Sequence, residues 1–409
     1  MLTSDAVLPR ASYVAVAVAL LASLLGAAAS AEGTPRRAIG TGLELVASVP
    51  FPGGTHLVTA TIKGRDYLFA ASAPSSGTGD LRVIDVTSPE RPRVVATLPC
   101  SDYQGHLQLS HDKKTLILGV DRPAGESTCM PAGEQGFITI NVRNPRRPKP
   151  LGYAAIPGGS HSTAAHPRKP RVYNAPEGSP APERRPPDME VWSIANPRKP
   201  KLVNTIPMPR THSPHDISFN KSGTMAAIAN ISSFHLLDTR DPVNPVVVYS
   251  GQCPGCQHTH EARFTRDGKT LVVNDEALGG PYPCPGGALY FYELAGAPES
   301  TTASLTGTYS IEDAGANSGG EAGFCTPHVF DISRDGTRVA ASWHSAGVRY
   351  LDITKHSGVT VGADSPAGGE GVRELGSYTS EGGDSFTAKF LRGPYIYSID
   401  IPSGLQIFR

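Results

Sequence analysis

The sequence predicts an all-β protein made of seven copies of one four-stranded unit, and three features of the chain support this prediction. Glycine (44) and proline (37) are frequent but spread along the 409 residues, which is typical of many short strands joined by turns. A strand–turn–strand segment and a histidine–hairpin segment both recur along the chain. A chain of this length is too long for one ordinary domain unless its architecture is a closed repeat.

Residues 1–31 have the features of a secretory signal peptide. Arg10 precedes an apolar run over residues 13–28, and Ala29-Ser30-Ala31 supplies a small-x-small cleavage pattern. The run is almost long enough to span a bilayer, so an uncleaved membrane anchor is the alternative. We expect a secreted, extracytoplasmic protein whose mature part, residues 32–409, is one domain with no membrane attachment after signal cleavage.

The first repeated segment is a strand, a Pro-x-x-Pro turn and a second strand. Because proline fixes φ and has no N–H donor, it belongs in the turn and not in the strands on either side. A Pro-x-x-Pro ligand for the aromatic groove of another protein is the alternative. The four copies span residues 80–99, 137–157, 189–207 and 234–250, with turn prolines Pro89 and Pro92, Pro145 and Pro148, Pro197 and Pro200, and Pro242 and Pro245.

The second repeated segment begins with a histidine and continues into a β-hairpin. Eight residues after four of these histidines comes a glycine in a turn such as SRDGT, where a hairpin reverses direction. The seventh unit has Asp384 or Ser385 at the position of the histidine. The six repeated histidines are His56, His106, His161, His215, His260 and His328.

Seven four-stranded units that close on themselves form a seven-bladed β-propeller. The chain ends in the third strand of the last unit, and residues 43–54 are similar to the fourth strands of other units. We therefore expect the N-terminal strand to complete the last blade and to remove its open edge. The segment VIDVTSPERP, within residues 80–99, resembles the LVIVD-repeat family of secreted β-propeller proteins. This resemblance extends over nearly all of the mature chain, but it implies a fold and not an activity.

The six repeated histidines are expected to meet at one mouth of the central channel, because each lies at the start of the strand that lines it. Clustered neutral imidazoles bind copper, iron, zinc or nickel. Inheritance during blade duplication is the alternative, although the residues beside each histidine have diverged while the histidine persists. We predict a transition-metal site formed by these six histidines and His258, with copper or iron favoured over zinc. His212 is expected at the same mouth.

Further polar residues lie in loops that open on this mouth. Asp216 and Glu261 directly follow two of the histidines, and His344 lies in a loop of the sixth unit. These three are the catalytic candidates, because they are placed to move protons or to orient ligands. Each also fits the role of an ordinary hydrogen-bonding loop residue. The other polar residues expected at this rim are Asp121, Asn174, Asn230, Asp275 and Glu276.

Six cysteines agree with an oxidising compartment and an even set of disulfides. Their places in the repeat favour the pairs Cys100–Cys129, Cys253–Cys284 and Cys256–Cys325. Alternatively, Cys256 and Cys325 are thiolate ligands or a redox pair, and Cys253-Pro-Gly-Cys256 is itself a CxxC motif.

Composition and missing motifs argue against several classes of function. Lys+Arg and Asp+Glu are equal at 37 each, which argues against a nucleic-acid partner. The chain has no Gly-x-Ser-x-Gly elbow, phosphate loop or dinucleotide fingerprint. The site resembles, in its construction only, the iron site of carotenoid oxygenases and the copper sites of nitrous oxide reductase and of a copper-dependent methanethiol oxidase.

We therefore predict a monomeric, copper- or iron-dependent oxidoreductase that acts on a small molecule or a peptide at the channel mouth. Two alternatives remain. One is a non-catalytic propeller that binds a protein, peptide or glycan on its rim, and the other is a divalent-metal hydrolase or lyase.

Overall fold

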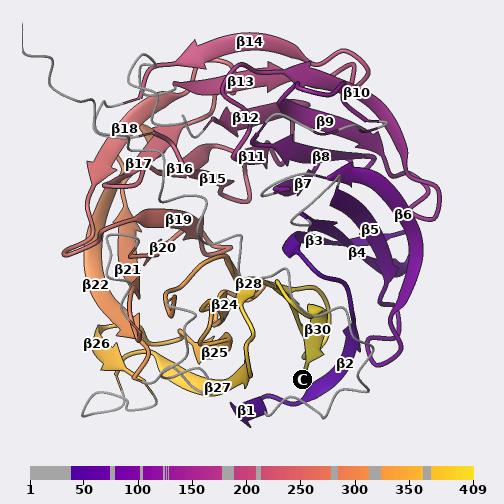
Figure 1. Cartoon of the computed structure of the whole chain (residues 1–409). Helices are drawn as coiled ribbons and strands as arrows, with labels where there is room; N and C mark the ends of the chain where they lie inside the picture. The colour runs from indigo at the N-terminus through magenta and orange to yellow at the C-terminus, as the bar shows by residue number, and fades with distance from the viewer. Residues whose placement is uncertain are drawn as a thin grey trace, which may run out of the picture. The chain divides into compact units, whose positions relative to one another are not determined.

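The computed structural model describes residues 38–73, 79–101, 105–122, 125, 127, 129–176, 188–208, 213–277, 284–312, 324–362 and 370–409. These residues form seven sheets arranged as blades around a central channel (Figure 1). The prediction of an all-β, seven-bladed propeller is confirmed. The predicted signal peptide and His212 lie outside the described residues. Within those residues, no helix is both long and apolar enough to cross a membrane.

Each blade contains four antiparallel strands that follow one another from the channel to the outside (Figure 1). The strands of blades one to four are β3 (Gly54–Ile62), β4 (Arg65–Ser72), β5 (Gly79–Asp85), β6 (Arg93–Ser101); β7 (Leu107–Leu109), β8 (Thr115–Val120), β9 (Gly136–Asn141), β10 (Lys149–Ala155); β11 (Ser162–Ala165), β12 (Arg171–Ala175), β13 (Met189–Ser193), β14 (Lys201–Ile206); and β15 (Asp216–Phe219), β16 (Met225–Ala229), β17 (Phe234–Asp238), β18 (Val246–Gly251).

The last three blades are completed by strands from elsewhere in the chain. Blade five gains a parallel strand from the sixth repeat, and blades six and seven each gain one from the N-terminal segment. Their strands are β19 (Thr259–Phe264), β20 (Thr270–Asp275), β21 (Ala288–Ala295), β22 (Thr302–Ser310) and β26 (Gly358–Val361), with the short helix η2 (Pro298–Ser300) before β22; β23 (Phe330–Ile332), β24 (Arg338–Ser342), β25 (Val348–Asp352), β27 (Arg373–Ser380) and β1 (Ala38–Thr41); and β28 (Ser385–Phe390), β29 (Ile396–Asp400), β30 (Gly404–Phe408) and β2 (Leu45–Val49).

The N-terminal segment closes the ring as the sequence predicts. Strand β2 pairs with β30, with Val49 opposite Leu405, so the N-terminal strand is the outer strand of blade seven. Strand β1 then pairs with β27, with Gly40 opposite Tyr378, and extends blade six as well. One short segment therefore covers the edges of two neighbouring blades, which leaves fewer unpaired backbone groups exposed.

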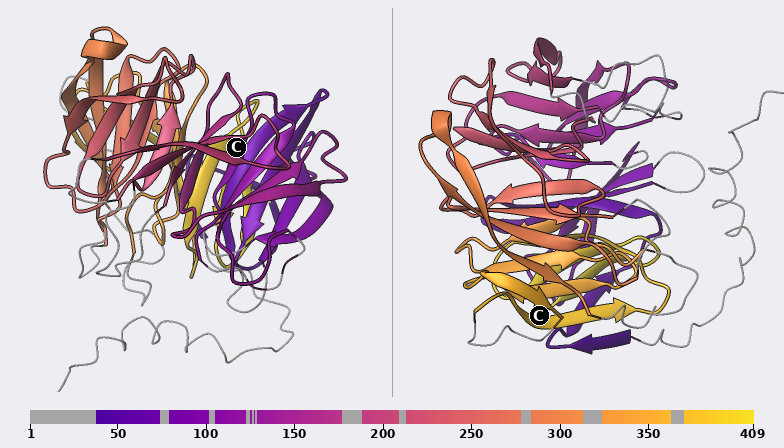
Figure 2. Two further views of the ribbon diagram at one scale, coloured as in Figure 1. Left: turned by 90° about the horizontal axis from the view of Figure 1, so that it is seen from above. Right: turned by 90° about the vertical axis from the view of Figure 1, so that its left-hand side faces the viewer.

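The hydrophobic core lies between neighbouring blades, which Figure 2 shows from the side as twisted sheets. Phe69 and Leu81 of blade one pack in one cluster with Leu116 and Leu118 of blade two. All six residues of β8 are buried. A middle strand that is covered on both faces has a continuous run of apolar residues and not an alternation of apolar and polar residues. This explains the sequence TLILGV.

The repeated turns lie where the sequence predicts. The Pro-x-x-Pro segments connect the third and fourth strands of their blades, for example between β17 and β18. The hairpin turn of blade four places Gly223 at φ +73°, and a Cβ atom there would lie 2.6 Å from the His166 ring. The His166 ring donates from Nε2 to the Gly223 carbonyl at 3.1 Å. His166 is therefore a structural residue that joins blade three to blade four.

The disulfide prediction is only partly right. Cys100–Cys129 is confirmed, but Cys253 bonds to Cys256, and Cys284 bonds to Cys325. The predicted pairs Cys253–Cys284 and Cys256–Cys325 are wrong. Cys256 and Cys325 are neither free thiols nor bonded to each other, which argues against the thiolate-ligand alternative, and the Cys253-Pro-Gly-Cys256 motif forms a disulfide.

Local backbone contacts explain these pairings. Gly255, at φ +78°, closes a tight turn in which the Cys256 N–H donates to the Cys253 carbonyl at 3.2 Å. The Cα atoms of Cys253 and Cys256 are consequently 5.4 Å apart. The Gly286 N–H donates to the Cys325 carbonyl, and the Cα atoms of Cys284 and Cys325 are 4.7 Å apart. Both separations suit a disulfide.

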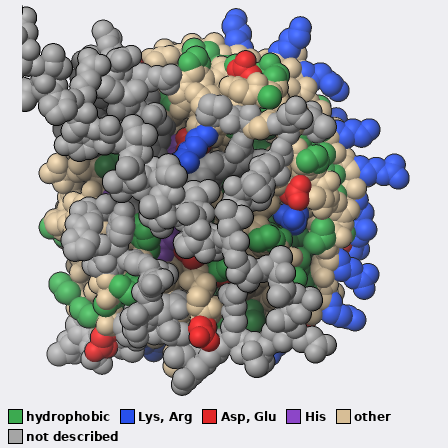
Figure 3. All heavy atoms as spheres, in the orientation of Figure 1, with side chains coloured by type: hydrophobic (Ala, Val, Ile, Leu, Met, Phe, Trp, Pro, Cys, Tyr) green, Lys and Arg blue, Asp and Glu red, His purple; other side chains and the backbone are tan. Residues whose placement is uncertain are grey.

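The zero net charge of the chain is unevenly distributed over the surface. Figure 3 shows exposed lysine and arginine side chains gathered along one part of the outer rim. The Pro-x-x-Pro segments of blades one to three supply many exposed cations, which lie at the periphery and not at the channel. They are Arg91, Arg93, Arg143, Arg146, Arg147, Lys149, Arg198, Lys199 and Lys201.

Candidate metal centre and histidine-lined channel mouth

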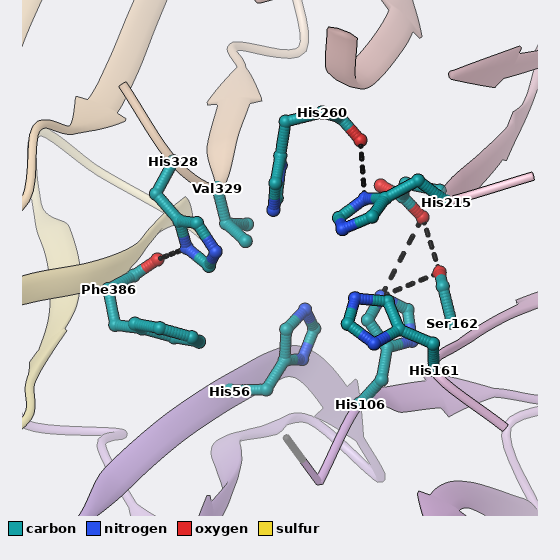
Figure 4. A pocket seen from close by; sticks show the side chains of 10 residues that line it. His56, His106, His161, Ser162, His215, His260, His328, Val329 and Phe386 are labelled. Atoms are coloured by element: carbon teal, nitrogen blue, oxygen red, sulfur yellow. Dashed lines mark hydrogen bonds and ion pairs between the residues drawn. The ribbon is translucent and has the colours of Figure 1, made fainter. Parts of the chain in front are cut away.

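The six repeated histidines line one cavity at the mouth of the channel, as Figure 4 shows from close by. All six are buried, with at most 9% of any residue exposed. Their rings follow one another closely, with centroids 4.2 Å apart for His56 and His106 and 4.1 Å apart for His260 and His328. The empty space in and around the cavity is about 330 Å³, a volume that includes open solvent. Its other lining residues are Ser162, Asp216, Val329 and Phe386.

Phe386 takes the place of the histidine in blade seven. In blade five, a bulge places His260 between the paired residues Thr259 and Glu261, and Phe386 has the same place between Ser385 and Thr387. The Phe386 ring lies 3.9 Å from the His328 ring. The prediction of Asp384 or Ser385 at this position is wrong, because the hairpin turn of blade seven is one residue shorter: five residues separate the paired Phe390 and Ile396, whereas six separate Phe264 and Leu271 in blade five.

Two of the ring histidines accept hydrogen bonds at Nδ1. The His56 Nδ1 accepts from the Leu107 N–H at 3.2 Å, and the His106 Nδ1 accepts from the Thr163 N–H at 3.3 Å. Because a backbone N–H can only donate, Nδ1 of each ring carries the lone pair, and Nε2 of the neutral ring carries the hydrogen. We call His56 and His106 the donor side of the mouth.

Three other ring histidines donate from Nδ1. The His215 Nδ1 lies 3.1 Å from the His260 carbonyl oxygen, and the His328 Nδ1 lies 2.6 Å from the Phe386 carbonyl oxygen. Because a carbonyl can only accept, these rings carry hydrogen on Nδ1 and a lone pair on Nε2. The His161 Nδ1 has a carboxylate partner, Asp121, at 3.3 Å. A histidine that binds a metal through Nε2 needs this lone pair.

Glu276 is surrounded by histidines. Its carboxylate oxygens lie 3.2 Å from Nε2 of His344 and 3.7 Å from Nε2 of His260, and they lie 3.9 Å from Nε2 of both His258 and His328. Burial raises the pKa of Glu276, but the hydrogen bond with His344 and the neighbouring imidazoles outweigh burial and lower it to about 2. Glu276 is therefore ionised. The sequence places it at the rim but does not single it out as a ligand.

Backbone contacts fix the loops that carry these groups. The Asp275 carboxylate accepts the N–H groups of Gln257, His258 and Ala277 at 3.0, 2.8 and 3.0 Å. Ala277 and His344 have φ of +51° and +41°, a region that residues other than glycine rarely adopt. Such backbone strain persists only where the surroundings enforce it. The chain therefore holds Glu276 and His344 in place.

His344 is a buried cation and not a ligand. Its Nδ1 lies 2.9 Å from Asp384 and its Nε2 lies 3.2 Å from Glu276. Burial would lower the pKa of His344, but these two carboxylates raise it to about 10. Both ring nitrogens consequently donate, and the imidazolium holds the Glu276 carboxylate. His344 does not line the cavity. A substrate in the cavity would therefore not contact His344 directly, as the predicted catalytic role requires.

His260, His328 and Glu276 could hold a metal ion. Among the described residues they form one group whose ligand atoms all lie within 4.8 Å of one another. Burial and neighbouring imidazoles lower the pKa of His260 well below its usual value, and burial lowers that of His328 to about 4, so both rings are neutral. Nε2 of His260 lies 3.7 Å from one Glu276 oxygen and Nε2 of His328 lies 3.9 Å from the other, somewhat longer than the roughly 3.4 Å between ligand atoms that bind a tetrahedral ion at about 2.1 Å.

We call His258, His260, His328 and Glu276 the metal side of the mouth. Two imidazoles and one carboxylate are the donor set of non-haem iron(II) sites and of many catalytic zinc sites. Of the seven histidines that the sequence predicts as ligands, the structure brings His260 and His328 into this set, with His258 beside it. The remaining four line the cavity outside it: His56, His106, His161 and His215.

Asp216 lines the cavity next to the donor side. Its carboxylate accepts the Ser162 hydroxyl at 2.6 Å and lies 3.8 Å from Nε2 of His106. Burial raises the pKa of Asp216, but His106, Arg263 and the hydrogen bonds outweigh burial and lower it. The ionised carboxylate therefore faces the Nε2–H of His106, a histidine outside the group of possible ligands.

Glu261 lies among charged groups apart from the cavity lining. It is fully buried, pairs with Arg263 and accepts the Phe330 N–H at 2.9 Å. Burial raises its pKa to about 7, against the opposing effects of Arg263 and Lys389. Lys389 donates to the Phe330 carbonyl at 3.1 Å. Glu261 thus belongs to a buried charged cluster that links blades five, six and seven. It does not line the cavity, as its predicted catalytic role requires.

This fold and this site define a β-propeller with buried imidazoles and a carboxylate at one mouth of its channel. No family model matches the chain, and no curated protein matches it.

Among solved structures, the chain is similar to the β-propeller domain of Swd1 from Myceliophteria thermophila, with 13% identity, a TM-score of 0.60, and coverage of 90% of this chain and 99% of that one. It is also similar to the periplasmic gluconolactonase of Pseudomonas aeruginosa, with 14% identity, a TM-score of 0.57, and coverage of 87% and 88%. A functionally unknown protein from Desulfotomaculum acetoxidans has 14% identity, a TM-score of 0.53, and coverage of 78% and 88%. At such identities these similarities show the propeller fold alone.

Proposed function

We propose that this protein is an exported, metal-dependent oxidoreductase whose metal is held by His260, His328 and Glu276. One observation carries the proposal. Two neutral imidazoles and one ionised carboxylate converge at the mouth of the channel, beside a cavity that is open to solvent. None of the three groups has to lose a proton before it binds a cation, so the site is ready at neutral pH.

The carboxylate favours iron(II) as the metal. A set of two histidines and one carboxylate is typical of non-haem iron oxygenases, whereas copper electron-transfer sites use histidine with cysteine and methionine. Iron is therefore preferred to copper, which the sequence treats as an equal candidate. Bound iron would supply a Lewis acid and a one-electron couple next to the cavity.

The surrounding residues would orient this site. His344 donates to Glu276 and keeps its carboxylate ionised. The Asn274 side chain donates to the His328 carbonyl at 2.8 Å and fixes the start of blade six against blade five. Groups of this kind usually determine ligand orientation and metal affinity.

The proposed export rests on the three disulfides, which are typical of oxidising compartments. The resemblance of residues 80–99 to the LVIVD-repeat family agrees with it, and we propose membership of that family on this resemblance.

A zinc-dependent hydrolase is the second candidate. The same donor set holds zinc in metallopeptidases, where it activates water. The fold similarity to a periplasmic gluconolactonase makes a lactone a reasonable substrate class to test. The identity of the bound metal separates the two candidates.

The proposal is tested by loading metal-free protein with iron(II) under anaerobic conditions, and separately with zinc(II) and copper(II). We expect about one ion per chain, with iron(II) giving oxidase or oxygenase turnover in a substrate screen. Glu276→Gln should abolish stoichiometric binding, while the exposed His111→Ala should bind as the wild type does.

Circular dichroism would show that Glu276→Gln remains folded. Stoichiometric metal in a folded Glu276→Gln protein would contradict the proposed site. Hydrolysis of lactones by the zinc form alone would favour the second candidate. A wild type that binds no metal would instead leave the non-catalytic binding propeller as the better description.

A further inference from the structure

The donor side of the mouth contains a hydrogen-bond donor that the protein does not use. His56 lies in a bulge of β3, between Gly54 and Leu57, and only 3% of it is exposed. Its Nδ1 accepts the Leu107 N–H, so the hydrogen of the neutral ring is on Nε2. Among the described residues, this Nε2 has no hydrogen-bond partner. A buried donor without a partner is costly, and a bound water, ion or ligand is one way in which such a group is satisfied.

His106 shows how the same arrangement looks when the protein itself satisfies it. Its Nδ1 also accepts a backbone N–H, but its Nε2 lies 3.4 Å from the Ser162 hydroxyl and 3.8 Å from Asp216. The His56 ring lies beside it, with the centroids 4.2 Å apart. Figure 4 shows the His56 ring reaching into the cavity, with one nitrogen directed toward its centre. The donor of His56 is thus left for a ligand.

The surroundings of His56 define the ligand. Burial lowers the pKa of His56 well below its usual value, and the neighbouring His106, Lys389 and Arg263 lower it further. The ring is therefore a neutral donor, for which a carboxylate or carbonyl oxygen is a suitable acceptor. Phe386 and Val329 line the same cavity and offer apolar contact. A small carboxylate or carbonyl compound with a short apolar body satisfies both conditions.

We propose that His56 is a substrate-binding residue whose Nε2–H donates a hydrogen bond to a carboxylate or carbonyl oxygen of a small organic substrate in the channel mouth. The apolar part of that substrate lies against Phe386 and Val329. Six equivalent histidines therefore serve two purposes, since some hold the metal and at least one holds the substrate. The assignment of the ligand as a substrate rests on the proposed function, whereas its binding does not.

The first test concerns the tautomer and needs no ligand. Histidine side-chain ¹⁵N spectra of the metal-free protein, assigned by loss of the signal in His56→Gln, should show the Nε2–H form of the neutral His56 ring at pH 7.5. A Nδ1–H form or a charged ring would overturn the inference.

The second test uses benzoate as the probe and the metal-free protein. Calorimetry should show that benzoate binds and that His56→Phe, which keeps a ring but removes the donor, weakens binding by about tenfold. His56→Gln, which restores an N–H, should recover most of the affinity, and His111→Ala should have no effect. Undetectable binding to the wild type, or equal binding to His56→Phe, would overturn the inference.

The third measurement separates this inference from the proposed function. His56→Phe should bind iron(II) as tightly as the wild type does, because His56 is not a ligand. Loss of metal in this variant would make His56 a ligand and would overturn the inference. If the wild type binds no metal but binds benzoate through His56, the proposed function fails and the inference stands.

Discussion

The donor side and the metal side of the channel mouth contain the same residue type at equivalent positions, yet their chemistry is opposite. The Nδ1 of His56 faces a backbone N–H of the next blade, whereas the Nδ1 of His328 faces a backbone carbonyl of the next blade. The first contact leaves Nε2 as a donor, and the second leaves it with a lone pair that could bind a metal. The repeat places an imidazole at each equivalent position, but the backbone group of the neighbouring blade determines which ring nitrogen carries the hydrogen.

The largest expected difference between the two sides is in metal affinity. His328→Ala removes a proposed ligand whose Nε2 lies 3.9 Å from Glu276, and we expect iron(II) affinity to fall on the order of 10³-fold, or about 4 kcal/mol. His106→Ala removes a ring whose Nε2 carries hydrogen, and the affinity should change by less than about threefold. Competition with a chelator of known affinity measures both variants. Equal losses would show that the two sides do not differ.

The loss of stability at acid pH should report the neutral state of the donor-side histidines in the metal-free protein. Burial lowers the pKa of His106 to about 4, from 6.5 in the unfolded chain, so the folded state binds fewer protons between these values. The stabilisation is complete above pH 6.5 and is lost as the pH falls toward 4, by roughly 3 kcal/mol for this one group. Urea unfolding of wild type and His106→Gln at pH 7 and pH 4.5 should show a smaller loss in the variant. An unchanged loss would mean that His106 titrates normally.

The contribution of His344 to stability should depend on pH in the opposite direction. Burial would lower its pKa, but Asp384 and Glu276 raise the pKa to about 10, so the folded state binds more protons than the unfolded chain does. This stabilisation is complete below pH 6.5 and is lost as the pH rises through about 10. Metal-free His344→Gln should be less stable than the wild type by about 1–3 kcal/mol at pH 6, and the gap should narrow by pH 10. A gap that widens with pH would contradict the charged state of His344.

The sequence predicts most of the fold and half of the site. Repeated turns and histidines at fixed offsets predict seven blades, closure through residues 43–54 and one buried ring of imidazoles, because each depends on local pattern. The tautomers of His56 and His328 depend on which backbone group of another blade comes within 3.5 Å, and no repeat contains that information. Strands β1 and β26 join blades to which they do not belong by repeat, so counting misses them.

Glu276 and the cysteines show two further limits. Glu276 lies in the loop that follows the second strand of its blade, and an acidic residue in this loop was the sequence feature that could have indicated a ligand. Its four imidazole neighbours come from two blades, and this arrangement cannot be read from the sequence. The Cys253-Pro-Gly-Cys256 turn is short enough to close on itself, and glycine at the left-handed position is the local signal for it. The pairing of Cys284 with Cys325 instead depends on two loops that approach in space.

Anomalous diffraction at the metal edge tests the central claim most directly. Crystals of protein loaded with one equivalent of iron(II) or zinc(II) should show one peak per chain between His260, His328 and Glu276, with no peak beside His56 or His106. A peak held by His56 and His106, or no peak at the mouth in crystals of a metal-loaded protein, would contradict the account.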